Sequence, residues 1–414
     1  MATTTPPETA PETAKPGAAP RLAAASRAWP IGFLILAVAI FVLFQWILPE
    51  APRDVRSFFQ DWLPLTTVNQ CIIWATFALG LNVVVGYAGL LDLGYVAFWA
   101  IGGYTAGWLM SGFFTQVQIN ILGHAVPGQP AGIHINFWLV LPIAGLFCAL
   151  WGILIGAPTL RLKSDYLALV TLGFGEIIPE VFRNGENING FNLSNGNKGI
   201  TPLDPIPTGP FSVIGLPKTL GPFDLTWKFL VYVLLAAFFI FVSLRIREGR
   251  LGRAWLAIRE DELAASMMGV PLMRTKLAAY GVGAFAGGLG GVAYATFTNN
   301  VTADDFAFAQ SIILLAMVVL GGMGNVWGVL VGALVLEWIN STGLSQGGSA
   351  INNALGTDID FPSYNFLIFG VILILMMLFR REGLLPESRT RQVLQEPERG
   401  ELESVGADLE GDPV

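Results

Sequence analysis

The feature that most constrains this chain is a series of long apolar segments that carry almost no charge. The first of them, Ile31–Leu48, has 18 uncharged residues, and comparable segments recur as far as residue 379. A hydrophobic segment of about 18 residues or more crosses a bilayer as a helix, because a helix bonds its own backbone polar groups away from water. The chain is therefore expected to be a membrane-embedded helical protein.

The composition agrees with a bilayer as the main solvent. Only 13% of the 414 residues are charged, 53% are hydrophobic and the mean hydropathy is +0.60, whereas a soluble domain carries about 25% charged residues. This balance excludes a collagen, a wholly disordered chain and a nucleic-acid-binding protein. Nine acidic and three basic residues fall between residues 382 and 414, so most of the net charge of −7 is local to the end of the chain.

The apolar segments predict an all-α, polytopic helix bundle with about ten spans. The segments that follow the first are Leu65–Val85, Ala88–Met110, Phe137–Leu160, Tyr166–Phe182, Phe229–Leu244, Leu277–Phe297 and Tyr364–Phe379. The stretch 309–340 is too long for one span, and glycines around Met323 interrupt it, so we divide it into two short helices. A re-entrant pair is the alternative for this stretch.

The basic residues orient these spans. Lys and Arg in short loops favour the cytosolic side of the membrane. With a cytosolic N-terminus and ten spans, only six of the 23 basic residues fall outside, and the loop 245–276 alone holds seven of the others. Both termini are therefore expected in the cytosol.

This topology divides the chain into three parts. Residues 1–28 are rich in Ala, Pro, Thr and Glu without an apolar period, which predicts a disordered cytosolic arm. Residues 29–380 form the transmembrane domain, with 245–276 as its large cytosolic loop. Residues 381–414 are expected to form an acidic cytosolic tail.

The sequence lacks the usual signatures of a nucleotide or metal site. None of the six lysines follows a glycine, so the chain has no GxxxxGK[ST] nucleotide-binding loop. Cys71 and Cys148 lie in apolar runs, where a thiol behaves as a small hydrophobic group. His124 and His134 share a loop without nearby acids or thiols, so we expect solvated side chains there, no metal site and no bound cofactor.

The cytosolic loop combines charge with apolar residues. Arg259, Glu260, Asp261 and Glu262 form a charged centre, and it is accompanied by Trp255, Ile258, Leu263, Met267 and Met268. A solvated helix held by local ion pairs needs no apolar face, so this composition favours a helix that docks into a groove on a partner.

Several segments resemble one family. The stretch from Arg259 to Gly291, REDELAASMMGVPLMRTKLAAYGVGAFAGGLGG, is similar to the cytosolic loop and following helix of LivM-type permeases of bacterial branched-chain amino acid ATP-binding cassette (ABC) importers. Four more segments resemble that family in the same order. They are LNVVVGYAGLLDLGYVAFWAIGGY (81–104), LRLKSDYLALVTLGFGEI (160–177), VVLGGMGNVWGVLVGA (318–333) and REGLLPE (381–387). The resemblance covers roughly residues 65–387.

The resemblance implies an ABC importer permease fold in the plasma membrane, and a multi-subunit transporter. Its partners would be two ABC ATPase subunits that bind the ATP, a second homologous permease and an extracytoplasmic substrate-binding protein, which would dock on the outer segment 183–228. Permeases of this kind contact the ATPase through a helix with an EAAxxxG-like pattern. Leucine replaces the Glu of that pattern at position 263. The candidate coupling residues are Arg253, Arg259, Glu260, Asp261, Glu262, Ala264, Ala265 and Gly269.

Polar residues within the spans are candidates for the substrate path, because ionisable groups in a bilayer are costly. Asp92, Glu176 and Asn82 are the candidates, although Asp92 and Glu176 also fit a helix-capping or other structural role. Glu180 and Glu337 are expected to extend to an interface. Gly283, Gly287 and Gly291 lie four residues apart, which predicts close helix packing.

Two further readings of the sequence stay open at this point. A urea or short-chain amide importer has a similar permease, and a gradient-driven secondary transporter would use the buried carboxylates as ion sites. An intramembrane enzyme is disfavoured, because neither histidine nor cysteine belongs to a catalytic arrangement.

Overall fold

The computed structural model describes residues 19–123, 125, 131–162, 164–209, 217–380 and 383–385. Most of these residues are helical. The α-helices are α1 (Ala19–Val42), α2 (Leu48–Glu50), α3 (Arg53–Trp62), α4 (Leu65–Leu81), α5 (Val96–Leu109), α6 (Phe137–Thr159), α7 (Ser164–Arg183), α8 (Leu225–Glu248), α9 (Arg250–Glu260), α10 (Glu262–Met267), α11 (Leu272–Thr298), α12 (Phe308–Gly321), α13 (Val326–Trp338), α14 (Leu344–Leu355) and α15 (Asn365–Phe379).

Short π-helical and 3-10 segments extend or connect these helices. The π-helical segments are η1 (Leu43–Ile47), η2 (Asn82–Tyr87) and η6 (Ile339–Gly343), and the 3-10 segments are η3 (Gly196–Lys198), η5 (Ala303–Phe306) and η7 (Phe361–Tyr364). Because η2 continues α4 and η6 continues α13, both helices are longer than their α-helical parts.

The expected helical bundle is confirmed, and in the described residues five short strands lie in the connections between helices. They are β1 (Met110–Ser111), β2 (Ile119–Ile121), β3 (Ile133–Ile135), β4 (Ile206–Pro207) and β5 (Thr219–Leu220). The first three form a sheet in the order β1-β3-β2, with β1 antiparallel and β2 parallel to β3, and β4 pairs antiparallel with β5. Polar backbone in long connections needs such pairing once the chain leaves a helix.

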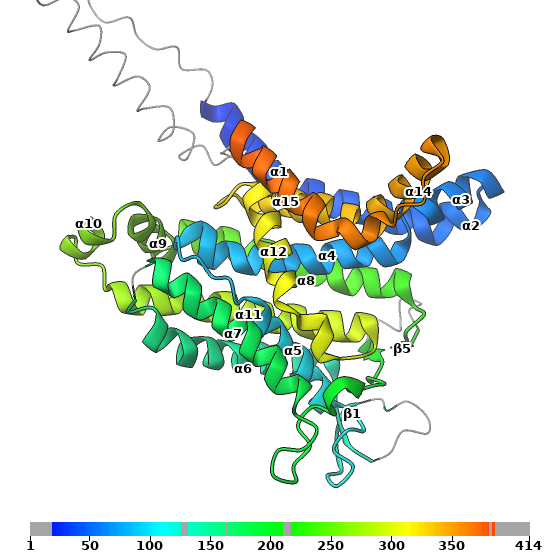
Figure 1. Cartoon of the computed structure of the whole chain (residues 1–414), viewed down its shortest axis with the longest axis horizontal. Helices are drawn as coiled ribbons and strands as arrows, with labels where there is room; N and C mark the ends of the chain where they lie inside the picture. Colours follow the sequence, from blue (N-terminus) through cyan, green and yellow to red (C-terminus); the bar gives the residue numbers. More distant parts are fainter. Residues whose placement is uncertain are drawn as a thin grey trace, which may run out of the picture.

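Within the described residues, seven helical segments are long and apolar enough to cross a membrane, and they start with residues 30–50 and 53–87. The others are residues 137–159, 225–248, 272–298, 326–355 and 361–379. Figure 1 shows α9 and α10 at one end of the long helices and β1 and β5 at the opposite end. We refer to these as the α9 end and the β end.

The central helix is α11, which packs mainly against α6, α5 and α4. Its small residues explain this position, because α11 contains six glycines and many alanines and lets neighbouring backbones approach closely. Around it, Trp99 of α5 packs between Phe77 of α4 and Tyr294 of α11, with ring centroids 4.2 Å and 4.9 Å away. By contrast, α1 and α15 lie at the edge of the bundle and expose apolar side chains (Figure 1).

The stretch 309–340 forms two separate helices, α12 and α13, that meet at a glycine turn. Gly322 and Gly324 adopt positive φ angles of 111° and 89° there, which glycine tolerates and other residues avoid. At the α9 end, Gly324 N donates to Asn82 Oδ1 over 2.9 Å, and at the β end the Thr67 and Thr342 hydroxyls lie 2.7 Å apart. Helix α13 with η6 therefore runs the length of α4.

Three segment boundaries differ from the sequence prediction. Residues 88–95 are not helical, so the run expected over Ala88–Met110 contains only the short helix α5. Helix α1 begins at Ala19, inside the arm expected to be disordered, because the alanine-rich stretch there favours helix. Leu384 N and Leu385 N donate to the carbonyl oxygens of Leu320 and Gly321, so the helical body includes residues 383–385 of the expected tail.

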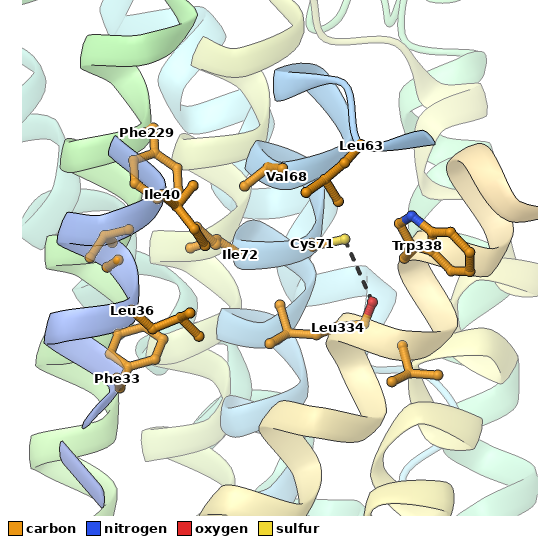
Figure 2. A pocket seen from close by; sticks show the side chains of 13 residues that line it. Phe33, Leu36, Ile40, Leu63, Val68, Cys71, Ile72, Phe229, Leu334 and Trp338 are labelled. Carbon is orange, nitrogen blue, oxygen red and sulfur yellow. Dashed lines mark hydrogen bonds between the residues drawn. The ribbon is translucent and has the colours of Figure 1, made fainter. Parts of the chain in front are cut away.

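An apolar cavity of about 510 Å³ separates α1 from α4, α8 and α13. Figure 2 shows Phe33, Leu36 and Ile40 of α1 facing Val68 and Ile72 across it. The polar atoms of its lining side chains come from Cys71 and Trp338, and the thiol donates to the Leu334 carbonyl oxygen over 3.6 Å. The lining is therefore almost entirely apolar and offers little to bind a charged solute.

Candidate functional site

The α9–α10 unit forms a compact projection at one end of the bundle. Gly249 ends α8 and precedes α9, and Asp261 separates α9 from α10. The Asp261 carboxylate accepts hydrogen bonds from the backbone N–H groups of Leu263 and Ala264, at 2.8 Å and 3.0 Å, and so caps α10. Gly269 then leaves the unit with φ +83°, and nothing lies near the position of a Cβ atom there.

Arg259 connects this projection to the membrane helices. Its Nη1 donates a hydrogen bond to the Gly86 carbonyl oxygen in η2, over 2.5 Å. Gly89 lies directly under the Arg259 side chain, with φ +68°, and a Cβ atom at Gly89 would come within 2.9 Å of Arg259 Cγ. We call Asn82, Gly86, Gly89, Arg259 and Gly324 the α4–α9 junction.

Two further contacts hold the projection against α11. Trp255 is fully buried and donates from Nε1 to the Thr275 carbonyl oxygen over 2.7 Å. Lys276 Nζ lies 2.6 Å from Glu262 Oε1, and its side chain is only 9% exposed, whereas that of Glu262 is 53% exposed. The projection is therefore packed on α11 through a side chain from each of its two helices.

The structure divides the predicted apolar face of the loop into two parts. Trp255 and Ile258 are buried within this chain and are not available to a partner, because α9 uses them to pack on α11. Leu263, Met267 and Met268 of α10 and its end are strongly exposed. The surface free for docking is thus α10, which is smaller than the sequence pattern indicated.

The candidate coupling residues occupy different surroundings. Glu260, Asp261, Glu262, Ala264 and Gly269 are exposed on the projection, whereas Ala265 is buried. Arg253 donates to the Glu248 carbonyl oxygen over 2.8 Å and so supports the α8–α9 corner. Arg259 faces the bundle, so its contact is with α4 of this chain.

The α4–α9 junction includes a segment that sequence analysis missed. The α12–α13 turn reaches Asn82 through Gly324, and Asn325 Nδ2 donates to the Leu385 carbonyl oxygen over 2.8 Å. The glycine cluster that divides 309–340 was the only signal for this meeting point. The ends of α4, α12 and α13 that lie at the α9 end therefore contact one another, α9 and the segment after α15.

Asp92 lies in the extended segment that replaces the first part of a helix. It is 1% exposed, its Oδ1 accepts from Gly94 N over 2.9 Å, and it lies beside Tyr280 of α11. The carboxylate thus lies in the extended segment four residues before α5, where it bonds the backbone of that segment.

Glu176 lies elsewhere, on the exposed face of α7, and Asn82 is buried in the junction. Asn82 therefore lies in the α4–α9 junction, near the contact between Arg259 and Gly86. Asp92 is buried inside the bundle, and Glu176 is exposed on its surface. Glu180 is exposed and bonds Arg183 over 2.7 Å. Glu337 is buried, which contradicts the expected extension to an interface, because α13 turns it toward α4 and Cys71.

The three spaced glycines of α11 face α4 and α5. A Cβ atom at Gly283 would lie 2.3 Å from Val84 Cγ2, one at Gly287 would lie 2.9 Å from Phe98 Cβ, and one at Gly291 would lie 2.4 Å from the Trp99 carbonyl oxygen. Each of these distances is shorter than the contacts that real Cβ atoms make. Glycine at these positions therefore lets the backbone of α11 lie close to α4 and α5.

The loop histidines do not form a pair that can be described. His124 lies outside the described residues, and His134 is buried on β3 with Nδ1 2.8 Å from Asp204 Oδ2. This contact joins the first sheet to the segment before β4 and differs from the solvated side chain we expected. Cys71 and Cys148 are both buried and unlinked.

The fold and the site define a class: a multi-pass helical membrane protein with a projection at one end and broken helices within the bundle. Residues 63–377 match the family described as the permease component of branched-chain amino acid transport systems. The chain belongs to this family. It is therefore a multi-pass permease subunit of the inner membrane and not itself an enzyme.

Relatives from different organisms agree with this assignment. The high-affinity branched-chain amino acid transport system permease protein LivM of Escherichia coli (strain K12) is 36% identical over 343 residues, covering 78% of this chain and 70% of the relative. The probable branched-chain amino acid transport permease protein LivM of Methanocaldococcus jannaschii is 26% identical, covering 78% and 95%. The LivH permease protein of the same E. coli strain is 22% identical, covering 77% and 93%. No solved structure matches the chain.

Proposed function

We propose that this chain is the permease subunit of an ABC importer for branched-chain amino acids of the Leu, Ile and Val type. The observation that carries the proposal is the α4–α9 junction in a chain of this family. It joins an exposed projection to the broken membrane helices. ATP hydrolysis by separate subunits would drive alternating access, and this chain would need no cofactor of its own. The relatives do not favour a urea importer or a gradient-driven transporter.

The proposed topology has ten crossings, made by α1, α4, α5, α6, α7, α8, α11, α12, α13 and α15. Seven of them belong to the long apolar segments. Helix α7 adds a 20-residue helix, and the 14-residue helices α5 and α12 add two more. Residues 88–95 supply the missing length before α5, and the α12–α13 turn at the α9 end supports two crossings over a re-entrant pair.

The α9 end would lie in the cytosol, together with both termini. The loop 245–276 holds seven basic residues, which favours that side. Gly383–Leu385 pack on the α12–α13 turn at the same end, which supports a cytosolic C-terminus. The β end, with Asp204 and the segment 183–228, would then face the binding protein.

The junction offers a route from ATP hydrolysis to the membrane helices. An ATPase that moves α10 would displace α9 and the start of α11 as well, because Glu262 of α10 bonds Lys276 and Trp255 of α9 bonds the Thr275 carbonyl oxygen of α11. Arg259 would pass that movement to Gly86 and Gly89. The extended segment that begins there leads to Asp92 and α5, so the coupling helix would act on the segment that breaks a span.

The partners would be two ABC ATPase subunits, a second homologous permease and an extracytoplasmic substrate-binding protein. Two differently named permease proteins, LivM and LivH, occur in the same E. coli strain, and both are similar to this chain. That similarity supports a transporter with two permeases of one fold. Asp92, Asn82 and Glu176 are proposed to line or shape the substrate path between alternating states.

Uptake assays test the function. Cells that lack this chain should lose energy-dependent uptake of labelled leucine, and the restored chain should recover it. Isoleucine and valine should compete with leucine, whereas urea and acetamide should not. Competition by urea would instead support the amide importer. Uptake by the purified chain alone under a proton or sodium gradient would support the secondary transporter.

A cysteine at Met323 tests the topology, because Met323 is partly exposed in the α12–α13 turn and both native cysteines are buried. M323C should react with an impermeant maleimide only from the cytosolic side. Met268→Cys, on the exposed projection, is the positive control for that side. Labelling of M323C from outside would contradict the ten-span arrangement.

A further inference from the structure

The exposed face of α7 carries carboxylates where a lipid-facing helix carries none. Its exposed residues are Tyr166, Leu169, Glu176, Ile177, Glu180 and Val181, and they recur at helical spacing. A helix rises about 1.5 Å per residue, which places Glu176 about 10 Å from the end of α7 at Arg183. Since α7 spans the bilayer in the proposed topology, Glu176 lies within that span and not at its end.

Glu176 and Glu180 differ in how their charge is compensated. Arg183 lies between Glu180 Oε2 and Asp304 Oδ1, at 2.7 Å and 2.8 Å, so Glu180 belongs to an ion-pair network at the end of the helix. Glu176 has no such pair in the part of the chain that the structure describes. It lines a hollow of about 430 Å³ with Ile177, Glu180, Val181 and Asn184.

Other edge helices show what a lipid-facing surface looks like in this molecule. The exposed side chains of α15 between Phe366 and Phe379 are all large and apolar, and Leu146, Leu150 and Leu154 of α6 continue the same pattern. A carboxylate facing hydrocarbon is costly, so residues of this kind face protein or water within a membrane. The exposed face of α7 is therefore incomplete in the isolated chain.

Within the described residues, α7 packs against α5, α6, α12, η3 and η5. These contacts leave uncovered the face that carries Glu176, Ile177, Glu180 and Val181.

We propose that the exposed face of α7 is the surface on which the second, homologous permease packs, with the hollow at Glu176 forming a water-filled part of the substrate path between the two subunits. The proposal rests on the proposed function, since it requires a second permease. A homologous permease is the fitting occupant, because one E. coli strain has two differently named permease proteins that are both similar to this chain. The uncovered carboxylate of Glu176 also lies within the span proposed for α7.

Site-specific photocross-linking in the assembled transporter tests this surface. A benzophenone amino acid is placed at Leu169 or Ile177, which are 65% and 55% exposed, and at the matched control Ile374 of α15, which is 64% exposed. The two α7 positions should give an adduct that mass spectrometry identifies as the second permease, and Ile374 should give none. Cross-links from α7 to lipid only, to a second copy of this chain or to another subunit would overturn the proposal.

A charge variant supplies an independent readout. Glu176→Leu should leave the subunits associated but cause a clear loss of uptake, because it removes the carboxylate from a hydrated path. If Glu176 faced lipid, the Glu176→Leu variant would instead show normal uptake, and its stability would be unchanged or improved. Purification of the transporter without any second permease would contradict the proposed function itself. A second permease that co-purifies but does not cross-link to α7 would contradict only the assignment of this surface.

Discussion

Arg259 Nη1 of α9 donates a hydrogen bond to the Gly86 carbonyl oxygen at the end of α4, over 2.5 Å. The two residues lie 173 positions apart in the sequence. Through this bond, the exposed α9–α10 projection contacts the end of η2. The extended segment 88–95 begins directly after it. The junction therefore joins the proposed ATPase contact to the proposed substrate path.

Replacing Arg259 should uncouple transport without removing the protein from the membrane. A hydrogen bond from a charged donor contributes about 1.5–3 kcal/mol, so Arg259→Ala is expected to reduce leucine uptake about tenfold or more. Arg259→Lys should recover only part of it, because lysine lacks the planar fork of arginine. Arg250→Ala, at an exposed position on the same helix, is the control. Normal uptake by Arg259→Ala would remove this residue from the coupling route.

Gly89→Ala should disturb the same junction from the other side. The new Cβ would lie 2.9 Å from Arg259 Cγ, and the φ of +68° is unfavourable for alanine, so we expect a cost of about 1–3 kcal/mol. The measurement is the thermal unfolding of the purified protein together with uptake. Gly370→Ala on α15, where no atom lies within 4 Å, should change neither. A Gly89→Ala protein as stable and active as the parent would show that the junction tolerates displacement.

Glu262 should stabilise the fold through its contact with Lys276, whose side chain is almost buried. Glu262→Ala leaves the Lys276 ammonium without its partner at 2.6 Å, at an expected cost of about 1–2 kcal/mol because Glu262 itself is half exposed. Replacing both residues, with Glu262→Ala and Lys276→Met, should recover part of the lost stability. Unfolding curves of Glu262→Ala, Lys276→Met and the double variant decide this. Additive losses would mean that the residues act independently.

The glycines of α11 give a matched stability test within one helix. Gly291→Ala would place a Cβ 2.4 Å from the Trp99 carbonyl oxygen, so overpacking should cost about 1–3 kcal/mol. At Gly281 the nearest atom is Ile153 Cγ1 at 3.4 Å, so Gly281→Ala should be neutral or slightly stabilising through helix propensity. Equal melting temperatures for the two variants would contradict the close approach of α11 to α5.

Sequence patterns located the helices well because a membrane helix needs a long apolar run, and such runs are easily found. They failed at residues 88–95, since an apolar extended segment has the same composition as an apolar helix and its hydrogen bonds go to distant partners. Leu93 N, for example, donates to Thr171 Oγ1 over 3.1 Å.

The candidate site was predictable in its chemistry but not in its geometry. The charges of 259–262 marked the projection, yet no pattern indicated that Arg259 turns toward Gly86 or that Trp255 is buried. Those contacts join segments far apart in the sequence. Likewise, Asp92, Asn82 and Glu176 were chosen because each is polar within a span, and only the structure separates the buried Asp92 from the exposed Glu176.

The central claim is that this chain works as one permease within a multi-subunit ATP-driven importer. The most direct test is to tag the chain in its own host, extract it gently and identify the co-purifying proteins by quantitative mass spectrometry. We expect two ATPase subunits and a second permease for each copy of this chain. Recovery of the chain alone, or only with copies of itself, would contradict it.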